Sequence, residues 1–244
     1  GAAIATVIGQ WVAMVITLLA VMKKYSLRGT FKPEFCKQIY ANGIGSIVTQ
    51  SLYTIYIVGL NMILKIFTED AVTVLGIYYK IQSFFFIPLL GFQQVLLPLF
   101  SYHYGAGDRH RNRNILKCSM TFSAAIMAVA TGIFLLFPEK LVQIFSMEST
   151  ILSIGKYAFP VISISFVFAG LTIVITSYLQ GIAHIKSSLF IIVLRQIVLL
   201  IPLAWVFHFM GLNAVWWTFP VTEIIASMTG ILIIVILHKQ DSTL

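Results

Sequence analysis

The sequence predicts an all-α membrane protein, a polytopic transmembrane helix bundle with about seven spans. Of its 244 residues, 59% are hydrophobic and only 10% are charged, and the mean hydropathy is +0.95. A soluble domain typically carries about 25% charged residues, so composition alone excludes an ordinary soluble fold. Long apolar segments recur along the whole chain, and the connections between them are alternately rich and poor in basic residues.

Each expected span is a segment of about 20 mostly apolar residues, which is the length that crosses roughly 30 Å of hydrocarbon. The first begins at the first residue of the sequence, so the chain reads as part of a longer protein. The third is the longest and contains two prolines, at which we expect it to tilt or break. The seven segments run over residues 1–22, 42–64, 71–99, 118–137, 157–179, 189–207 and 213–237.

Lysine and arginine in the connections predict the topology. Alternate connections, with the C-terminal tail, hold eleven of these residues, against three in the others. Basic residues collect on the cytoplasmic side, so the N-terminus is expected outside and the C-terminus in the cytoplasm of a cell (inner or plasma) membrane. The eleven are Lys23, Lys24, Arg28, Lys32, Lys37, Arg109, Arg111, Arg113, Lys117, Lys186 and Lys239, and the three are Lys65, Lys140 and Lys156.

The most polar stretch, LFSYHYGAGDRHRNRNILKC at Leu99–Cys118, is interpreted as a cytoplasmic turn between two spans. Its glycines permit a tight reversal, and its arginines hold the topology. A phosphate-binding loop would need the pattern GxxxxGK[ST] after a strand, and a nucleic-acid surface would need stacking aromatics on a basic face. Neither is present, so no nucleic-acid partner is expected. SYHYGAGD from Ser101 is echoed by SYLQGIAH from Ser177.

Nothing in the sequence indicates an enzyme, a metal site or a cofactor. Cys36 and Cys118 are far apart and lack a CxxC partner, the five histidines lie at span ends or in connections, and there is no HExxH. The absence of charged rings or a filter motif also argues against a channel.

A polar stripe runs along one face of the second expected span. Asn42, Ser46, Thr49, Tyr53 and Tyr56 are spaced four, three, four and three residues apart, with Gln50 at the border. That spacing places them on one helix face, which does not face lipid comfortably. The stripe therefore lines a water-filled cavity or forms hydrogen bonds between helices, and the sequence leaves both open.

Three charged residues fall inside expected spans. Glu223 is the only carboxylate there, and Lys80 and Arg195 are the bases. Buried charges need partners and usually face the bundle interior. Glu223 either binds a proton or a cationic substrate, or is a structural acid. Arg195 can pair with Glu223 or with carbonyl groups of a broken helix, and we favour the structural interpretation for both.

Five prolines interrupt the expected spans and are candidate kinks, because each lacks a backbone donor. Such kinks serve alternating access in transporters, although membrane helices also tolerate proline without it. They are Pro88, Pro98, Pro160, Pro202 and Pro220.

Four blocks resemble the multidrug and toxic compound extrusion (MATE) transporters, in order and spacing. They are GAAIATVIGQ at Gly1–Gln10, IPLLGFQQVLLPLFSYHYGAGD at Ile87–Asp108, SYLQGIAH at Ser177–His184 and LNAVWWTFPVTE at Leu212–Glu223. The resemblance implies the C-terminal half of a twelve-helix protein with two six-helix lobes. Residues 1–22 would be the sixth helix, 23–41 a basic cytoplasmic linker and 42–244 the C-terminal lobe.

The resemblance also implies a function. Such transporters export organic cations and amphipathic compounds, driven by H⁺ or Na⁺, so the expected partners are the bilayer, the missing N-terminal lobe and a small amphipathic or cationic substrate. Na⁺-coupled members carry acids on the seventh and tenth helices, near Tyr53 and Ala169, and neither position is acidic here. Coupling would then reside in the missing lobe. The alternatives are a related flippase for lipid-linked saccharides and, from a different class, a membrane-embedded enzyme.

Overall fold

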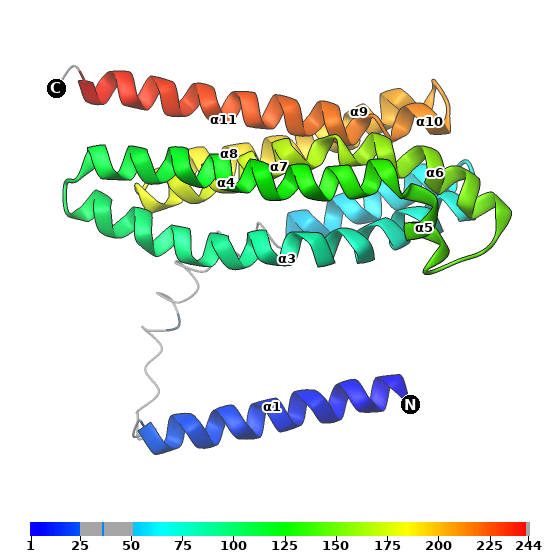
Figure 1. The fold of residues 1–244 in the computed structure, drawn as a ribbon, viewed down its shortest axis with the longest axis horizontal. Coiled ribbons are helices and arrows are strands. Elements are labelled where there is room, and N and C mark those ends of the chain that lie inside the picture. The colour runs from blue at the N-terminus through cyan, green and yellow to red at the C-terminus, as the bar shows by residue number, and fades with distance from the viewer. Residues whose placement is uncertain (25–35, 37–50, 243–244) are drawn as a thin grey trace. The chain divides into compact units, whose positions relative to one another are not determined.

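The computed structural model describes residues 1–24, 36 and 51–242, which are helices and short connections without any strand (Figure 1). The chain divides into two compact units, residues 1–44 and 45–244. The described part of the first unit is mainly α1 (Ala2–Lys24), an apolar helix that ends in two lysines and coincides with the first expected span. The all-α transmembrane fold class is thus confirmed.

The second unit contains the remaining helices. The helix Ser51–Lys65 is the described part of the expected span 42–64. It is followed by α3 (Glu69–Gly105), α4 (Arg109–Leu136), α5 (Pro138–Gln143), α6 (Ser149–Ser163), α7 (Ser165–Gly181), α8 (Ile185–Val193), the π-helical segment η1 (Leu194–Leu199), α9 (Leu200–His208), α10 (Leu212–Val215) and α11 (Thr218–Ser242).

Length and apolarity make α1, α3, α4, the run from α8 to α9 and the run from α10 to α11 candidate spans. The pair α6 and α7 forms a sixth, broken span, bent by 43°. These six correspond to six of the seven expected segments. The remaining expected segment, residues 42–64, lies partly outside the described residues.

The two echoed sequences form the same turn. After α3, the N–H of Asp108 donates to the carbonyl of His103, and Gly107 has a positive φ of 74°. After α7, the N–H of His184 donates to the carbonyl of Leu179, and Ala183 takes the corresponding φ of 62°. The Asp108 side chain then caps α4 by accepting from the N–H of Arg111 at 2.9 Å. The polar stretch is therefore a helix-to-helix turn, as the sequence predicts.

The prolines fall differently from the expectation. Pro88 and Pro98 lie inside α3, which continues through both, so the third expected span does not break there, and a kink at either proline stays a prediction. Packing and local adjustment in a bundle satisfy the carbonyls that proline leaves free. Pro220 lies in the first turn of α11, where a missing donor costs little, whereas Pro202 lies in α9 directly after the π turn η1, inside the helical run from α8 to α9. Pro160 lies inside α6, four residues before the break at Ile164.

Helix α7 is the centre of the second unit and packs against α3, α4 and α11. Small residues allow these close contacts, as is usual between membrane helices. At Gly181 an added Cβ would lie only 2.5 Å from the Cβ of Phe100, on α3. On the other side of the core, the ring of Tyr78 contacts four phenylalanine rings, those of Phe134, Phe159, Phe166 and Phe219.

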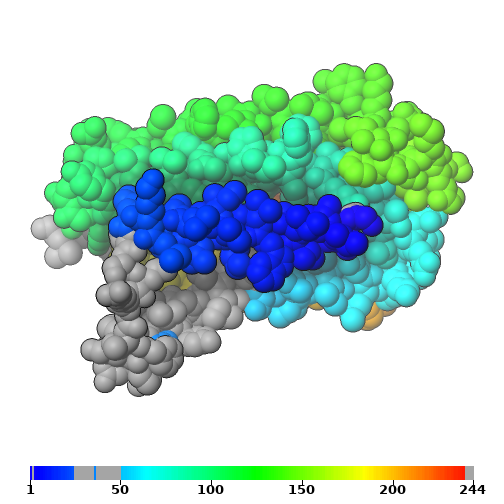
Figure 2. Space-filling view, turned by 90° about the horizontal axis from the view of Figure 1, so that it is seen from below, coloured from blue at the N-terminus to red at the C-terminus, as the bar shows by residue number. Residues whose placement is uncertain are grey.

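The connections of the second unit alternate between its ends. The turn between α3 and α4 and the end of α11 lie at one end, and α5 and α10 lie at the other (Figure 1). From a second direction, the connection that contains α5 projects at its end of the unit (Figure 2). Large apolar side chains such as Phe84, Val129 and Leu232 are exposed along the helices between these ends, as expected of a lipid-facing surface.

Candidate functional site

A small polar pocket of about 50 Å³ lies inside the second unit, among six of its helical segments. It is large enough for a few water molecules and much smaller than a drug-sized pocket of about 300–1,000 Å³. Its lining consists of Tyr56, Tyr78, Tyr79, Gln82, Phe86, Ser165, Ala169, Arg195, Gln196, Leu200, Phe219 and Glu223.

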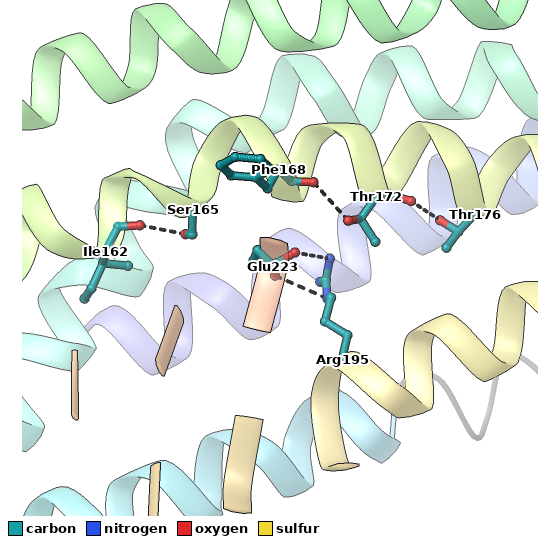
Figure 3. A network of polar contacts seen from close by, with 7 residues as sticks. All are labelled: Ile162, Ser165, Phe168, Thr172, Thr176, Arg195 and Glu223. Atoms are coloured by element: carbon teal, nitrogen blue, oxygen red, sulfur yellow. Dashed lines mark hydrogen bonds and ion pairs between the residues drawn. The ribbon is translucent and has the colours of Figure 1, made fainter. Parts of the chain in front are cut away.

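An ion pair between Arg195 and Glu223 lies at the pocket (Figure 3). Arg195 Nη1 is 3.4 Å from Glu223 Oε2, and Arg195 Nε is 3.4 Å from Oε1. The guanidinium and carboxylate therefore face each other along two parallel contacts. Both contacts are longer than the roughly 2.7–2.9 Å of a tight charge-assisted hydrogen bond. Of the two arrangements that the sequence left open for Arg195, the structure contains the pair with Glu223.

The two charged residues are held by different kinds of helix. Glu223 lies in the second turn of α11, a regular helix, and its side chain is 11% exposed. Arg195 belongs to η1, a π-helical turn between α8 and α9, and its side chain is 23% exposed. A π turn widens the helix and is frequently found at functional sites. Here it allows the neighbouring Arg195 and Gln196 both to line the pocket.

Gln196 is an unusual neighbour of the pair. Its side chain is buried, and its Oε1 atom has no hydrogen-bond partner among the described residues. A buried acceptor without a donor is costly, and in natural proteins it commonly marks a place for water or a ligand. The pocket beside it provides the space for such a partner.

The remaining walls are largely aromatic. Tyr56 and Tyr79 approach each other edge-to-face, with ring centroids 6.5 Å apart, across the gap between the helix Ser51–Lys65 and α3. Phe86 and Phe219 complete this lining. Aromatic faces carry partial negative charge and attract cations within about 6 Å.

The break between α6 and α7 lies beside the pocket, close to Ser165 (Figure 3). Hydroxyl groups replace the backbone donors lost there. Ser165 Oγ donates to the carbonyl of Ile162 at 2.6 Å, and Thr131 Oγ1 of α4 donates to the carbonyl of Ser163 at 3.0 Å. These bonds stabilise a bent helix without closing it into a continuous one.

The polar stripe is only partly described. Tyr56 lines the pocket, and the exposed Tyr53 packs edge-on against it with centroids 5.3 Å apart. Asn42, Ser46, Thr49 and Gln50 lie outside the described residues.

Lys80, which the sequence groups with the buried charges, has an exposed side chain. Its Nζ lies 5.7 Å from the centroid of the Phe145 ring, away from the pocket. Lys80 follows Tyr79 by one residue, so it points to another face of α3. Grouping it with Glu223 and Arg195 was wrong.

Sequence reasoning did not single out Tyr78, Tyr79 or Ser165. A signal was present, because Tyr79, Gln82 and Phe86 follow a three- and four-residue spacing along one face of α3. In an apolar helix such a spacing of tyrosine and glutamine marks the polar face. The π turn that brings Gln196 into the pocket has no comparable signal in the sequence.

A family model described as MatE matches residues 45–206, which is most of the second unit. The chain belongs to the MatE family. The resemblance drawn from the four sequence blocks is thereby confirmed. The MatE helices include every element that lines the pocket except α11, which carries Glu223.

Named MatE relatives are transporters. The multidrug export protein MepA of Staphylococcus saprophyticus is 23% identical over 98% of this chain and 54% of its own length. The structure of the MATE multidrug transporter DinF-BH in complex with rhodamine 6G is 26% identical, with a TM-score of 0.79, over 96% of this chain and 54% of that one. The Vibrio cholerae MATE transporter VcmN in its bent form is 20% identical, with a TM-score of 0.79, over 95% and 54%. The chain spans about half the length of the curated relatives it matches.

Proposed function

We propose that this chain is the C-terminal lobe of a secondary active antiporter that exports drugs or other organic cations in exchange for H⁺ or Na⁺. The observation that carries the proposal is the MatE match over residues 45–206. The relatives named as multidrug transporters are about twice as long as this chain, so the proposed partner is a second, N-terminal lobe. The transport pathway then lies between two lobes, and this chain contributes one of its walls.

The pocket chemistry supports export of cations. The Glu223 carboxylate lies among tyrosine and phenylalanine rings, so it attracts a positively charged amphipathic molecule when its pairing with Arg195 is released. The pocket of about 50 Å³ is too small for such a molecule, so the described conformation is closed to substrate at this point.

Alternating access requires helices that bend, and two irregular helices meet at the pocket. The 43° break between α6 and α7 lies on one side, and the π turn η1 lies on the other. Discontinuous helices next to a central site are a recurring element of secondary transporters. We propose that these two segments absorb the change of shape.

The ion-coupling acid is proposed to lie in the other lobe. The resemblance implies that Na⁺-coupled members carry acids near the positions of Tyr53 and Ala169. Neither residue is acidic here, and Ala169 lines the pocket without a charge. Glu223 is paired with Arg195 and is assigned a different role below.

A drug-sensitive bacterial host without its own efflux pumps tests the proposed function. The chain should give no resistance to rhodamine 6G or ethidium when expressed alone. Expression together with the proposed N-terminal lobe should lower dye accumulation and raise resistance. Unchanged accumulation with both lobes present at normal abundance in the membrane would contradict the proposal, and export by this chain alone would contradict the need for a second lobe.

The proposed topology has the turn between α3 and α4 and the C-terminus in the cytoplasm. Arg111, in the first turn of α4, and Met147, in the connection between α5 and α6, are both exposed and lie at opposite ends of the second unit, so they form a matched pair for labelling. In a cysteine-free background, Arg111→Cys should react with an impermeant thiol reagent only after the membrane is opened. Met147→Cys should react in intact cells. The reverse pattern would overturn the topology.

A further inference from the structure

We propose that Arg195 occupies the binding place of the substrate: its guanidinium is the resident cation of an organic-cation site whose anionic group is Glu223. An incoming organic cation binds Glu223 only when Arg195 has left it. This inference rests on the proposed function for its substrate class, and it assigns to the pocket the group that recognises the cation and the group that competes with it.

The ion-pair geometry supports displacement. A guanidinium that is a permanent structural partner of a carboxylate usually makes two short bonds, whereas both contacts of Arg195 with Glu223 are 3.4 Å. The charges attract each other, but neither contact has the length of a strong hydrogen bond. An exogenous cation therefore competes with a weakened partner.

Burial indicates which partner moves. The Glu223 side chain is 11% exposed and projects from a regular part of α11. The Arg195 side chain is twice as exposed, at 23%, and extends from the π turn η1. Because arginine has a long side chain with several rotatable bonds and already reaches towards solvent, the guanidinium can leave while the carboxylate stays.

The rest of the pocket suits a cation that is not Arg195. Tyr56, Tyr79, Phe86 and Phe219 provide aromatic faces, and the unpartnered Oε1 of buried Gln196 provides a neutral acceptor. Arg195 is the only basic residue among the described residues that line the pocket. Withdrawal of its side chain thus leaves a cavity with one negative charge, aromatic walls and a free acceptor, in which an organic cation replaces the guanidinium.

Size leads to the same conclusion. With Arg195 in place only about 50 Å³ is free, so the guanidinium and a substrate cannot be accommodated together. Binding is then mutually exclusive, and the affinity for substrate is reduced by the free energy of the internal pair.

Free methylguanidinium tests the proposal on the purified chain in detergent, because it carries the same charged group as the arginine side chain. Arg195→Ala vacates the place and leaves Glu223 unpaired. Thermal unfolding and isothermal titration should show methylguanidinium, which is small enough for the vacated place, binding at least tenfold more tightly to Arg195→Ala than to the unmodified chain. The double variant Arg195→Ala/Glu223→Gln should lose that gain, and Lys80→Ala, which removes a charge outside the pocket, should behave like the unmodified chain.

Several outcomes decide against the proposal. Arg195→Ala that binds methylguanidinium no better than the unmodified chain overturns it, and so does a double variant that binds methylguanidinium as tightly as Arg195→Ala. If Arg195→Ala does not fold, the shorter, neutral Arg195→Gln and purification in 5 mM methylguanidinium provide the readout: recovery of folded protein supports the proposal, and no recovery opposes it. Binding is measured here without transport, so the two proposals can fail separately. If the two-lobe protein exports dye but Arg195→Ala binds methylguanidinium no more tightly, only this inference is refuted. If Arg195→Ala binds more tightly but the two-lobe protein exports nothing, only the proposed function is refuted.

Discussion

Replacing Glu223 by glutamine measures how much the internal ion pair stabilises the second unit. Glutamine keeps the shape and removes the charge, so the Arg195 guanidinium loses its counter-ion in a partly buried place. Breaking a fully buried pair costs about 3–5 kcal/mol, and an exposed pair contributes about 0–1 kcal/mol. With side chains 11% and 23% exposed and contacts of 3.4 Å, the pair lies between these limits. We expect Glu223→Gln to lower the free energy of unfolding by about 2 kcal/mol.

For a unit of this size, about 2 kcal/mol corresponds to a fall in Tm of roughly 4–8 °C. The assay is thermal unfolding of the purified chain in one detergent, followed by intrinsic fluorescence. The double variant Arg195→Gln/Glu223→Gln removes both charges and should recover at least half of the loss, because no charge is then left unpaired. The matched control is Glu139→Gln, since Glu139 pairs with Lys156 through side chains that are 48% and 65% exposed, and it should change Tm by less than about 2 °C.

Two results would refute this reasoning. The first is a Glu223→Gln chain with unchanged Tm and abundance, which would show that the pair contributes nothing to the fold. If that stable variant also abolished export by the two-lobe protein, Glu223 would be an acid that titrates during transport. The second is a double variant that is no more stable than Glu223→Gln. That result would show that Arg195 and Glu223 do not stabilise each other.

Four further changes, in two pairs, test the helix contacts and turns by the same unfolding assay. Gly181→Ala should destabilise the chain by about 1–3 kcal/mol, because the new Cβ would lie 2.5 Å from a Cβ of α3 that no side-chain rotation can move. Gly76→Ala, where an added Cβ meets nothing within 4 Å, should be neutral or slightly stabilising, and a loss equal to that of Gly181→Ala would contradict the close contact. Gly107→Ala should destabilise the turn after α3 by about 1 kcal/mol, and Ala183→Gly should stabilise the matching turn after α7 by up to about 1 kcal/mol, since both residues have positive φ. If Gly107→Ala and Ala183→Gly both stabilised or both destabilised the chain, the two turns would not be equivalent.

Much of the fold follows from the sequence for a simple physical reason. A membrane helix must satisfy its backbone internally over about 20 apolar residues, so hydropathy fixes where α1, α3, α4 and α11 lie. The turns are equally readable, because SYHYGAGD and SYLQGIAH place a small residue at the position of positive φ. Glu223 and Arg195 were identified because charge inside a span is costly and requires a partner.

The irregular features were not predictable in the same way. The break at Ile164 follows Pro160 by four residues, whereas Pro88 and Pro98 leave α3 continuous, so proline alone does not locate a break. Packing against α4, through Thr131 and the carbonyl of Ser163, stabilises the broken ends, and such a contact spans 32 residues of sequence. The π turn at Arg195 likewise depends on its neighbours. Lys80 was misassigned because the position of a residue within a span gives its depth in the membrane but not the face of the helix on which its side chain lies.

The measurement that tests the central claim most directly is gradient-driven transport of rhodamine 6G in vesicles that contain both lobes. In inside-out membrane vesicles from the expressing host, an imposed pH or Na⁺ gradient with the higher ion concentration inside the vesicle should drive dye accumulation. Dissipating that gradient should release the dye. Vesicles with this chain alone should accumulate none. Accumulation that is the same with and without a gradient, or absent when both lobes are present and folded, would contradict the account.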